Sequence, residues 1–172
     1  MEFQHELVIP DEGLPFKFFL FEGSQGNYVR EKHWHTSVEI FAVMEGSLTF
    51  YLNDEKHPLK AGEPMIINSN EVHSIDSPEE NHTAVLQIPL KQFEDYFTAH
   101  RFIRFAGSLP EMDGKLSKLV REMYKLYGKR GTGYEFKIRS FYYDVLYLLV
   151  NYYRLDEAGE QEVRHSRRLD AL

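Results

Sequence analysis

The chain has no cysteine, which excludes disulfide bonds, thiolate metal ligands and cysteine nucleophiles from its chemistry. Basic side chains are also scarce: there are 20 Lys and Arg against 27 Asp and Glu, and the formal net charge is −7. A nucleic-acid-binding surface needs clustered basic residues to neutralise phosphates. We therefore do not expect this chain to hold DNA or RNA by itself.

Long apolar runs are missing as well. The most apolar stretch, residues 145–150, is far shorter than the roughly 20 residues that a membrane-spanning helix needs. Residues 1–6 lack the basic start and apolar core of a signal peptide. We expect a cytoplasmic protein with no membrane partner. Its 13 Phe and 11 Tyr indicate a globular rather than a disordered chain.

Between Phe16 and Pro89, short apolar runs alternate with turn-forming residues, a pattern typical of consecutive β-strands. The expected strands cover residues 16–21, 38–44, 47–52, 64–67 and 84–88. Many short strands at this spacing predict a β-sandwich or a barrel.

Beyond Pro89 the apolar residues recur at helical spacing. We predict a short helix over 91–99, a second from an N-cap at Asp113 to Tyr127, and a third over 134–155. The third helix is apolar on more than one side. This predicts that it packs on the barrel and also on its own copy in a homodimer; the alternative is a helix enclosed within one chain.

Three histidines and one glutamate form the most informative pattern. His33, His35 and Glu39 are spaced to share one face of a strand, since side chains in a strand alternate, and His73 follows two strands later. Three imidazoles and a carboxylate suit a divalent metal such as zinc, nickel, manganese or iron. The other interpretation is a metal-free polar pocket in which these groups bind an effector or one another.

This pattern resembles the paired motifs of cupins, in which a His-x-His and a glutamate are joined by a later histidine. Gly46 and Gly62, with 15 residues between them, lie where that family has its glycines. Two positions depart from the family: Asn68 replaces a proline and Asn70 a glycine. Because asparagine tolerates the left-handed conformation, the second change is physically mild.

Residues 39–46, 58–63 and 66–75 narrow the likeness to the amino-terminal domain of AraC-type transcription regulators, and residues 135–140 and 167–172 continue it. The resemblance implies a mainly β fold with α: a cupin (double-stranded β-helix) barrel followed by a two- to three-helix dimerisation segment. The expected divisions are 1–90 for the barrel and its N-terminal arm, 91–158 for the dimerisation helices, and 159–172 for a linker. We expect DNA contact only through a further domain beyond Leu172.

The resemblance also implies a small, sugar-like effector in the barrel. The candidate effector-binding residues are His33, His35, Glu39, His73, Tyr28 and Arg30, and the first four are the candidate metal ligands. Residues before Phe16, stiffened by Pro10 and Pro15, are expected to form an arm over the barrel mouth.

No nucleophile triad or phosphate loop is visible, and we expect no catalytic residues and no enzymatic activity. One alternative is a stand-alone cupin enzyme whose metal activates water or dioxygen in oxygenase or isomerase chemistry. A carbohydrate-binding module without regulatory output is another. The apolar helical half, which a minimal metal cupin does not need, favours the sensor.

Overall fold

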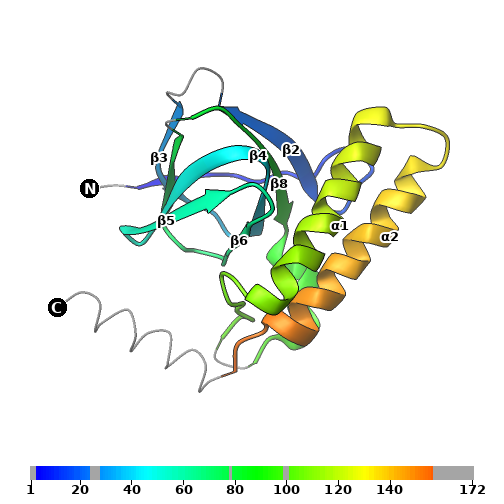
Figure 1. Cartoon of the computed structure of the whole chain (residues 1–172). Coiled ribbons are helices and arrows are strands. Elements are labelled where there is room, and N and C mark those ends of the chain that lie inside the picture. The colour runs from blue at the N-terminus through cyan, green and yellow to red at the C-terminus, as the bar shows by residue number, and fades with distance from the viewer. Residues whose placement is uncertain (1–2, 24–27, 78, 99–100, 157–172) are drawn as a thin grey trace.

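The computed structural model describes residues 3–23, 28–77, 79–98 and 101–156. In these residues a mixed sheet curls into a barrel, and the helices that follow lie against one side of its outer surface (Figure 1). The strands are β1 (Gln4–His5), β2 (Lys17–Gly23), β3 (Tyr28–Trp34), β4 (Val38–Leu52), β5 (Glu55–Lys60), β6 (Pro64–Ile67), β7 (His73–Ser77) and β8 (Asn81–Ile88). The helical elements are η2 (Leu90–Tyr96), α1 (Pro110–Lys129), α2 (Tyr134–Leu148) and the π-helical η3 (Leu149–Tyr153).

The long strand β4 holds the sheet together. The strand order is β1-β3-β7-β4-β8-β2, and β5 and β6 also pair with β4. The two strands predicted over 38–44 and 47–52 are one strand, because a bulge between Val43 and Glu45 bends the chain without ending it. Gly46 follows this bulge with φ +75°, and a Cβ there would lie 2.0 Å from the carbonyl oxygen of Glu80. Only glycine fits this position.

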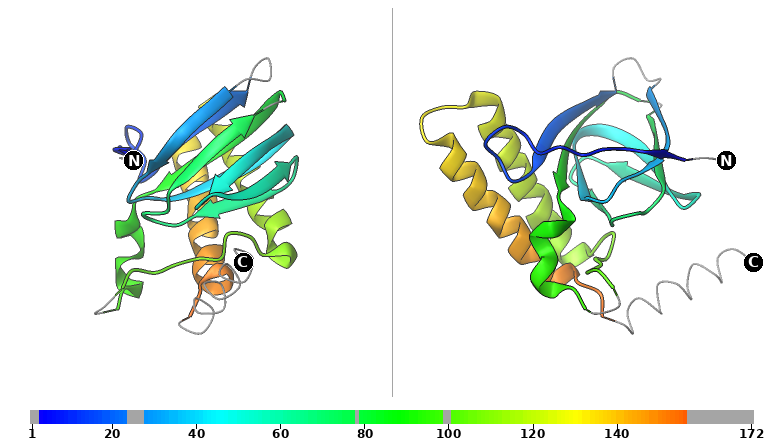
Figure 2. Two further views of the ribbon diagram at one scale, coloured as in Figure 1. Left: turned by 90° about the vertical axis from the view of Figure 1, so that its left-hand side faces the viewer. Right: turned by 180° about the vertical axis from the view of Figure 1, so that it is seen from behind.

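Two apolar cores lie on opposite faces of the sheet. One fills the barrel interior and includes Phe41, Phe50 and Ile75. The other lies between the outer face and the helices, which pack side by side there (Figure 2), and includes Ile40 and Tyr142. Since both faces of β4 are covered, residues 38–44 form an unbroken buried run instead of an alternating one.

Each predicted helix has a counterpart in the structure, but the bounds differ. The helix predicted from an N-cap at Asp113 begins at Pro110, a proline suited to the first turn, and Asp113 instead accepts a hydrogen bond from the Leu109 amide at 2.9 Å. The helix predicted over 91–99 is a 3₁₀ segment that ends at Tyr96, where Phe97 turns extended. The helix predicted over 134–155 is α-helical only to Leu148. None of the described helices has the length and apolarity to cross a membrane.

Strands β1, β3, β5 and β7 are not among those predicted from apolar runs. A tight hairpin connects β4 to β5: Asn53 and Asp54 both have positive φ, and β5 starts at the next residue. The short β1 and the polar strands β3 and β7 lack a strong apolar alternation, so their pairing depends on the assembled sheet.

Candidate functional site

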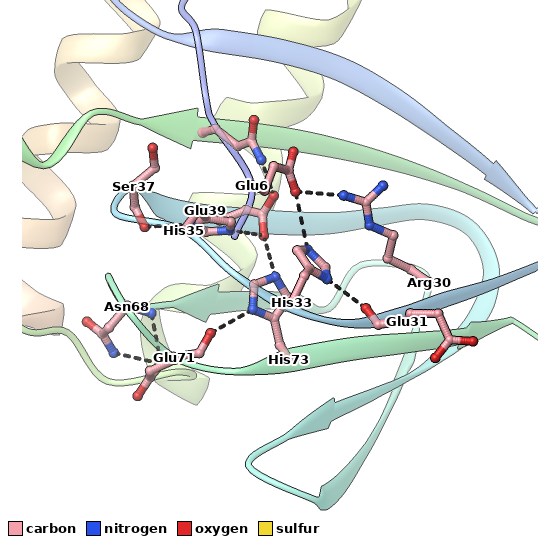
Figure 3. A network of polar contacts seen from close by, with 11 residues as sticks. Glu6, Arg30, Glu31, His33, His35, Ser37, Glu39, Asn68, Glu71 and His73 are labelled. Carbon is pink, nitrogen blue, oxygen red and sulfur yellow. Dashed lines mark hydrogen bonds and ion pairs between the residues drawn. The ribbon is translucent and has the colours of Figure 1, made fainter. Parts of the chain in front are cut away.

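The four predicted residues do converge, although not on one strand. β3 ends at Trp34, residues 35–37 turn, and β4 begins at Val38, so the single strand predicted through 33–39 is wrong. The convergence has another cause. His33 lies opposite His73 in the β3–β7 register, with ring centroids 4.2 Å apart, and the turn directs His35 toward the same point. We call His33, His35, Glu39 and His73 the histidine cluster (Figure 3).

The backbone fixes the orientation of all three imidazoles. Each ring approaches a carbonyl oxygen through Nδ1, and because a carbonyl only accepts, each Nδ1 carries a proton. The acceptors are Glu31 at 2.9 Å for His33, Ser37 at 3.1 Å for His35 and Glu71 at 2.9 Å for His73. Nε2 of each ring is thereby left for the cluster, and one nitrogen of each ring lies within 4.8 Å of the others.

Glu39 is the buried acid of the cluster. Its Oε2 lies 3.0 Å from Nε2 of His35 and 3.1 Å from Nε2 of His73, and its Oε1 accepts a hydrogen bond from Nε2 of Gln87 at 2.8 Å. The His73 contact lacks hydrogen-bond alignment, so this buried Nε2 has no hydrogen-bond partner. Burial opposes the charge of Glu39, but the neighbouring imidazoles hold the pKa of this carboxyl well below its usual range.

His35 differs from the other rings because both of its nitrogens face acceptors. Burial lowers its pKa, but the hydrogen bond and charge of Glu39 outweigh this and raise the pKa above 6.5. Burial and the neighbouring His73 lower the pKa of His33. In the metal-free cluster Glu39 thus favours the charged form of His35, whereas burial and His73 favour the neutral form of His33.

The donor set fits a divalent metal ion. The three rings have Nδ1 tied to carbonyl oxygens, which is how proteins orient metal-binding histidines, and Nε2 of His73 is buried without a hydrogen-bond partner. One carboxylate completes a set of three nitrogens and one oxygen. A bound metal would replace the proton on Nε2 of His35.

Arg30 lies at the edge of the cluster and pairs with a residue that the sequence did not predict. Glu6 accepts a 2.8 Å hydrogen bond from Nη2 of Arg30, and the same oxygen lies 3.4 Å from Nε2 of His33. No local pattern could have identified Glu6, because the β1–β3 pairing brings it to the site from 24 residues away. For Tyr28, the structure describes the backbone at the start of β3 but not the side chain, so its predicted role stays a prediction.

Gln87 was also missed, although a signal existed. It is the lone polar residue of the predicted strand 84–88, fully buried and directly opposite Glu39 in the β4–β8 register. A single buried amide among apolar residues needs a hydrogen-bond partner, and Glu39 supplies one.

A second polar network connects the cluster to the end of the described chain. The carbonyl of Glu71 accepts from His73, while its carboxylate accepts from the Asn68 amide at 2.8 Å and from Nη2 of Arg104 at 2.5 Å. The carbonyl of Arg104 in turn accepts from the Leu155 amide at 2.9 Å. Glu71 thus contacts the cluster directly and is connected through Arg104 to the segment that leads to residue 156.

Comparison with known proteins gives two kinds of match. A family model, the AraC-like ligand binding domain, matches residues 15–146. No curated protein matches the chain.

Among solved structures, a predicted oxalate decarboxylase from Thermotoga maritima is 24% identical with a TM-score of 0.41, over 44% of this chain and 69% of its own. A cupin-2 domain protein from Shewanella frigidimarina is 27% identical with a TM-score of 0.39, over 46% and 76%. A Cupin 2 conserved barrel domain protein from Salinispora arenicola is 16% identical with a TM-score of 0.43, over 52% and 76%.

The predicted fold class, mainly β with α in a cupin barrel followed by helices, is confirmed. Since the family model covers well over half of the sequence, the chain belongs to the AraC-like ligand-binding domain family.

Proposed function

We propose that this domain binds a small effector at the histidine cluster and that binding changes the position of the chain beyond residue 156. In this proposal the domain is part of a bacterial DNA-binding transcription regulator and catalyses no reaction. The observation that carries the proposal is Glu71, which contacts His73 through its carbonyl and Arg104 through its carboxylate. A sensor needs such a connection between its ligand site and its output.

The buried charge supports a binding role. Glu39 is 2% exposed and lies among imidazoles in a barrel whose interior also holds an apolar core. Apolar residues of similar volume would stabilise the barrel as well or better, because desolvating an ion pair is costly. A buried carboxylate with a strongly lowered pKa is typical of functional sites.

Regulation requires that the effector bind two arrangements of the domain with different affinities. The Glu71 network offers the element that can differ. A ligand that moves the ring of His73 changes the hydrogen bond to the Glu71 carbonyl, and the Glu71 carboxylate positions Arg104 against the segment carrying Leu155.

A metal would be held by Nε2 of His33, His35 and His73 and by the carboxylate of Glu39. It would supply a Lewis acid for oxygen groups of the effector. Gln87 orients the Glu39 carboxylate by its 2.8 Å hydrogen bond, with or without a metal. In this proposal the cluster binds and does not turn over its ligand.

The exposed aromatic face of α2 supports the homodimer. Phe136, Tyr143 and Tyr147 are 71%, 58% and 59% exposed, and their spacing of seven and four residues places them on one face of the helix. Large exposed apolar groups gathered on one helix face are typical of protein contacts. We propose that two copies pack through this face and that DNA is bound only by a further domain.

Ligand-dependent stabilisation tests the function. A panel of small sugars and metabolites would be screened by the thermal midpoint of the wild-type chain. An effector at 100 times its Kd adds about 2.7 kcal/mol, which raises the midpoint by roughly 5–10 °C in a chain of this size. His73→Ala should abolish the shift, whereas His57→Ala, on the hairpin strand β5 outside the cluster, should retain it. A shift that survives His73→Ala would place the ligand elsewhere.

The donor set of the cluster favours one other function, a metal-dependent cupin enzyme. Near-stoichiometric metal in protein purified without added metal or a histidine tag, together with turnover that chelation abolishes, would support the enzyme over the sensor.

A further inference from the structure

The segment before β2 crosses the barrel toward β3 (Figure 2), and residues 4–9 contact β3 mainly through backbone pairing and polar side chains. β1 pairs with β3 at two positions, and the Glu6 amide donates to the carbonyl of Trp34 at 2.9 Å. Leu7 and Ile9, which could have anchored the segment by burial, are 73% and 65% exposed. The hold of residues 4–9 on the barrel is therefore weak, and Glu6 is the side chain of this segment that reaches the cluster (Figure 3).

The carboxylate of Glu6 lies between solvent and the histidine cluster. Its side chain is 20% exposed, whereas the side chains of His33 and His73 are 5% exposed or less. One oxygen of Glu6 contacts both Nη2 of Arg30 at 2.8 Å and Nε2 of His33 at 3.4 Å. A ligand that reaches His33 from this side must displace that oxygen.

The charge of Arg30 determines which ligand groups can replace the Glu6 carboxylate. An arginine guanidinium is a cation, so displacing Glu6 by a neutral group leaves Arg30 without the carboxylate that pairs with it. An incoming carboxylate restores the same charge-assisted hydrogen bond and can do so with two oxygens. Because Arg30 is 42% exposed, its pair with Glu6 is weak, so exchanging one carboxylate for another costs little.

We propose that Glu6 occupies the position of an acidic group of the effector, and that a small carboxylic acid binds by taking the place of Glu6 on Arg30, next to His33, and releasing residues 4–9. This inference rests on the proposed sensor function and deepens it. It narrows the expected small, sugar-like effector to a carboxylate, such as a sugar acid.

The protein contains its own reporter for this release. Trp34 is the only tryptophan of the sequence, and its ring lies 4.4 Å from that of His5, the residue next to Glu6. Separation of β1 from β3 therefore changes the surroundings of a single fluorophore, and a ligand that leaves the segment in place does not.

The test compares matched ligands and matched variants in chelator-treated protein. The ligands are acetate and glucuronate, each with a neutral counterpart, acetamide and glucose. Glu6→Gln removes the carboxylate with little change in shape. Glu12→Gln removes the same charge from an exposed position further along the segment. Binding is followed by calorimetry and release by Trp34 fluorescence.

We expect Glu6→Gln to bind glucuronate about tenfold more tightly than wild type, since the internal competitor is gone. Glu12→Gln should match wild type, Arg30→Gln should lose carboxylate binding, and glucose should gain nothing from any variant. In wild type, glucuronate should shift the Trp34 emission toward that of the ligand-free Glu6→Gln variant.

Equal carboxylate affinity in Glu6→Gln and Glu12→Gln would overturn the proposal, as would an equal gain for glucose. Weaker binding of Zn²⁺ in Glu6→Gln with unchanged carboxylate affinity would make Glu6 a metal ligand instead. A neutral effector that needs His73 but ignores Glu6 would overturn this inference and leave the sensor function standing. If no ligand is found whose binding depends on His73, both this inference and the proposed sensor function would be overturned.

Discussion

The side-chain amide of Asn68 forms two hydrogen bonds with the backbone of Phe105, donating to its carbonyl oxygen at 2.9 Å and accepting from its amide at 2.7 Å. Asn68 thus acts as a strand partner for a segment 37 residues away. The proline that cupins usually have at this position has no such amide. The asparagine that replaces the family's proline at position 68 therefore makes a specific contact between the barrel and the segment that pairs with Leu155.

Asn68→Ala should cost about 2–4 kcal/mol of unfolding free energy, because it leaves the buried amide and carbonyl of Phe105 without partners. Urea unfolding measures this. Asn151→Ala is the matched control, since it removes an exposed hydrogen bond to the carbonyl of Tyr147 and should cost well under 1 kcal/mol. Similar losses in the two variants would contradict the assigned role of Asn68.

Gly46→Ala should destabilise the barrel by about 3 kcal/mol or more, since its Cβ would lie 2.0 Å from the Glu80 carbonyl oxygen at a φ of +75°. Gly114→Ala, in α1 with nothing within 4 Å of the added Cβ, should instead stabilise by roughly 0.5–1 kcal/mol. Thermal unfolding of both variants checks the opposite signs. A neutral Gly46→Ala would show that the bend after Val43 is not fixed by this contact.

The His35–Glu39 pair predicts a pH dependence of stability in metal-free protein. Glu39 has a lowered pKa, so its contribution is present above about 4.5 and is lost as pH falls toward its folded pKa. His35 has a raised pKa, so its contribution is present below about 6.5 and is lost as pH rises through its folded pKa. The pair should stabilise most between these two values.

Glu39→Gln provides the comparison, since it removes the charge and retains the shape. The difference in unfolding free energy between wild type and Glu39→Gln should favour wild type most between about pH 4.5 and 6.5 and shrink on either side. A difference that does not vary with pH would mean that the pair is not ionised as described.

The exposed face of α2 predicts the oligomeric state. Tyr143→Glu combined with Tyr147→Glu should convert a dimer into a monomer, because four charges would face one another across the contact. Sedimentation measures the change. Tyr96→Glu, at a 47% exposed aromatic position on η2, should leave the dimer intact. A wild-type chain that sediments as a monomer would exclude this interface.

Local signals predicted much of the fold. The left-handed conformation that asparagine permits at Asn70 is present, with φ +63°, and its amide donates to the carbonyl of His35 at 2.8 Å. The convergence of His33, His35 and Glu39 was also correct, but the reason was not: a turn at 35–37, instead of strand alternation, directs His35 inward. Two different local conformations can bring the same residues together.

The remaining features depend on partners far away in the sequence. Glu6 reaches the site through β1–β3 pairing, and Glu71 acquires its role through Arg104, 33 residues later. The bend of β4 depends on pairing with β7 and β8, so apolar periodicity alone divided it into two strands. Such contacts leave no periodic pattern in the sequence.

Hydrogen exchange at the Leu155 amide tests most directly whether the domain is a sensor. This amide donates to the carbonyl of Arg104, which Glu71 connects to His73. An effector found by its His73-dependent stabilisation should change the exchange rate of Leu155 in wild type. Glu71→Gln weakens the pair with Arg104 but retains the carbonyl that holds His73. In this variant the effector should still bind, but its binding should no longer change the exchange rate of the Leu155 amide. An effector that binds wild type through His73 and leaves the exchange of Leu155 unchanged would contradict the account.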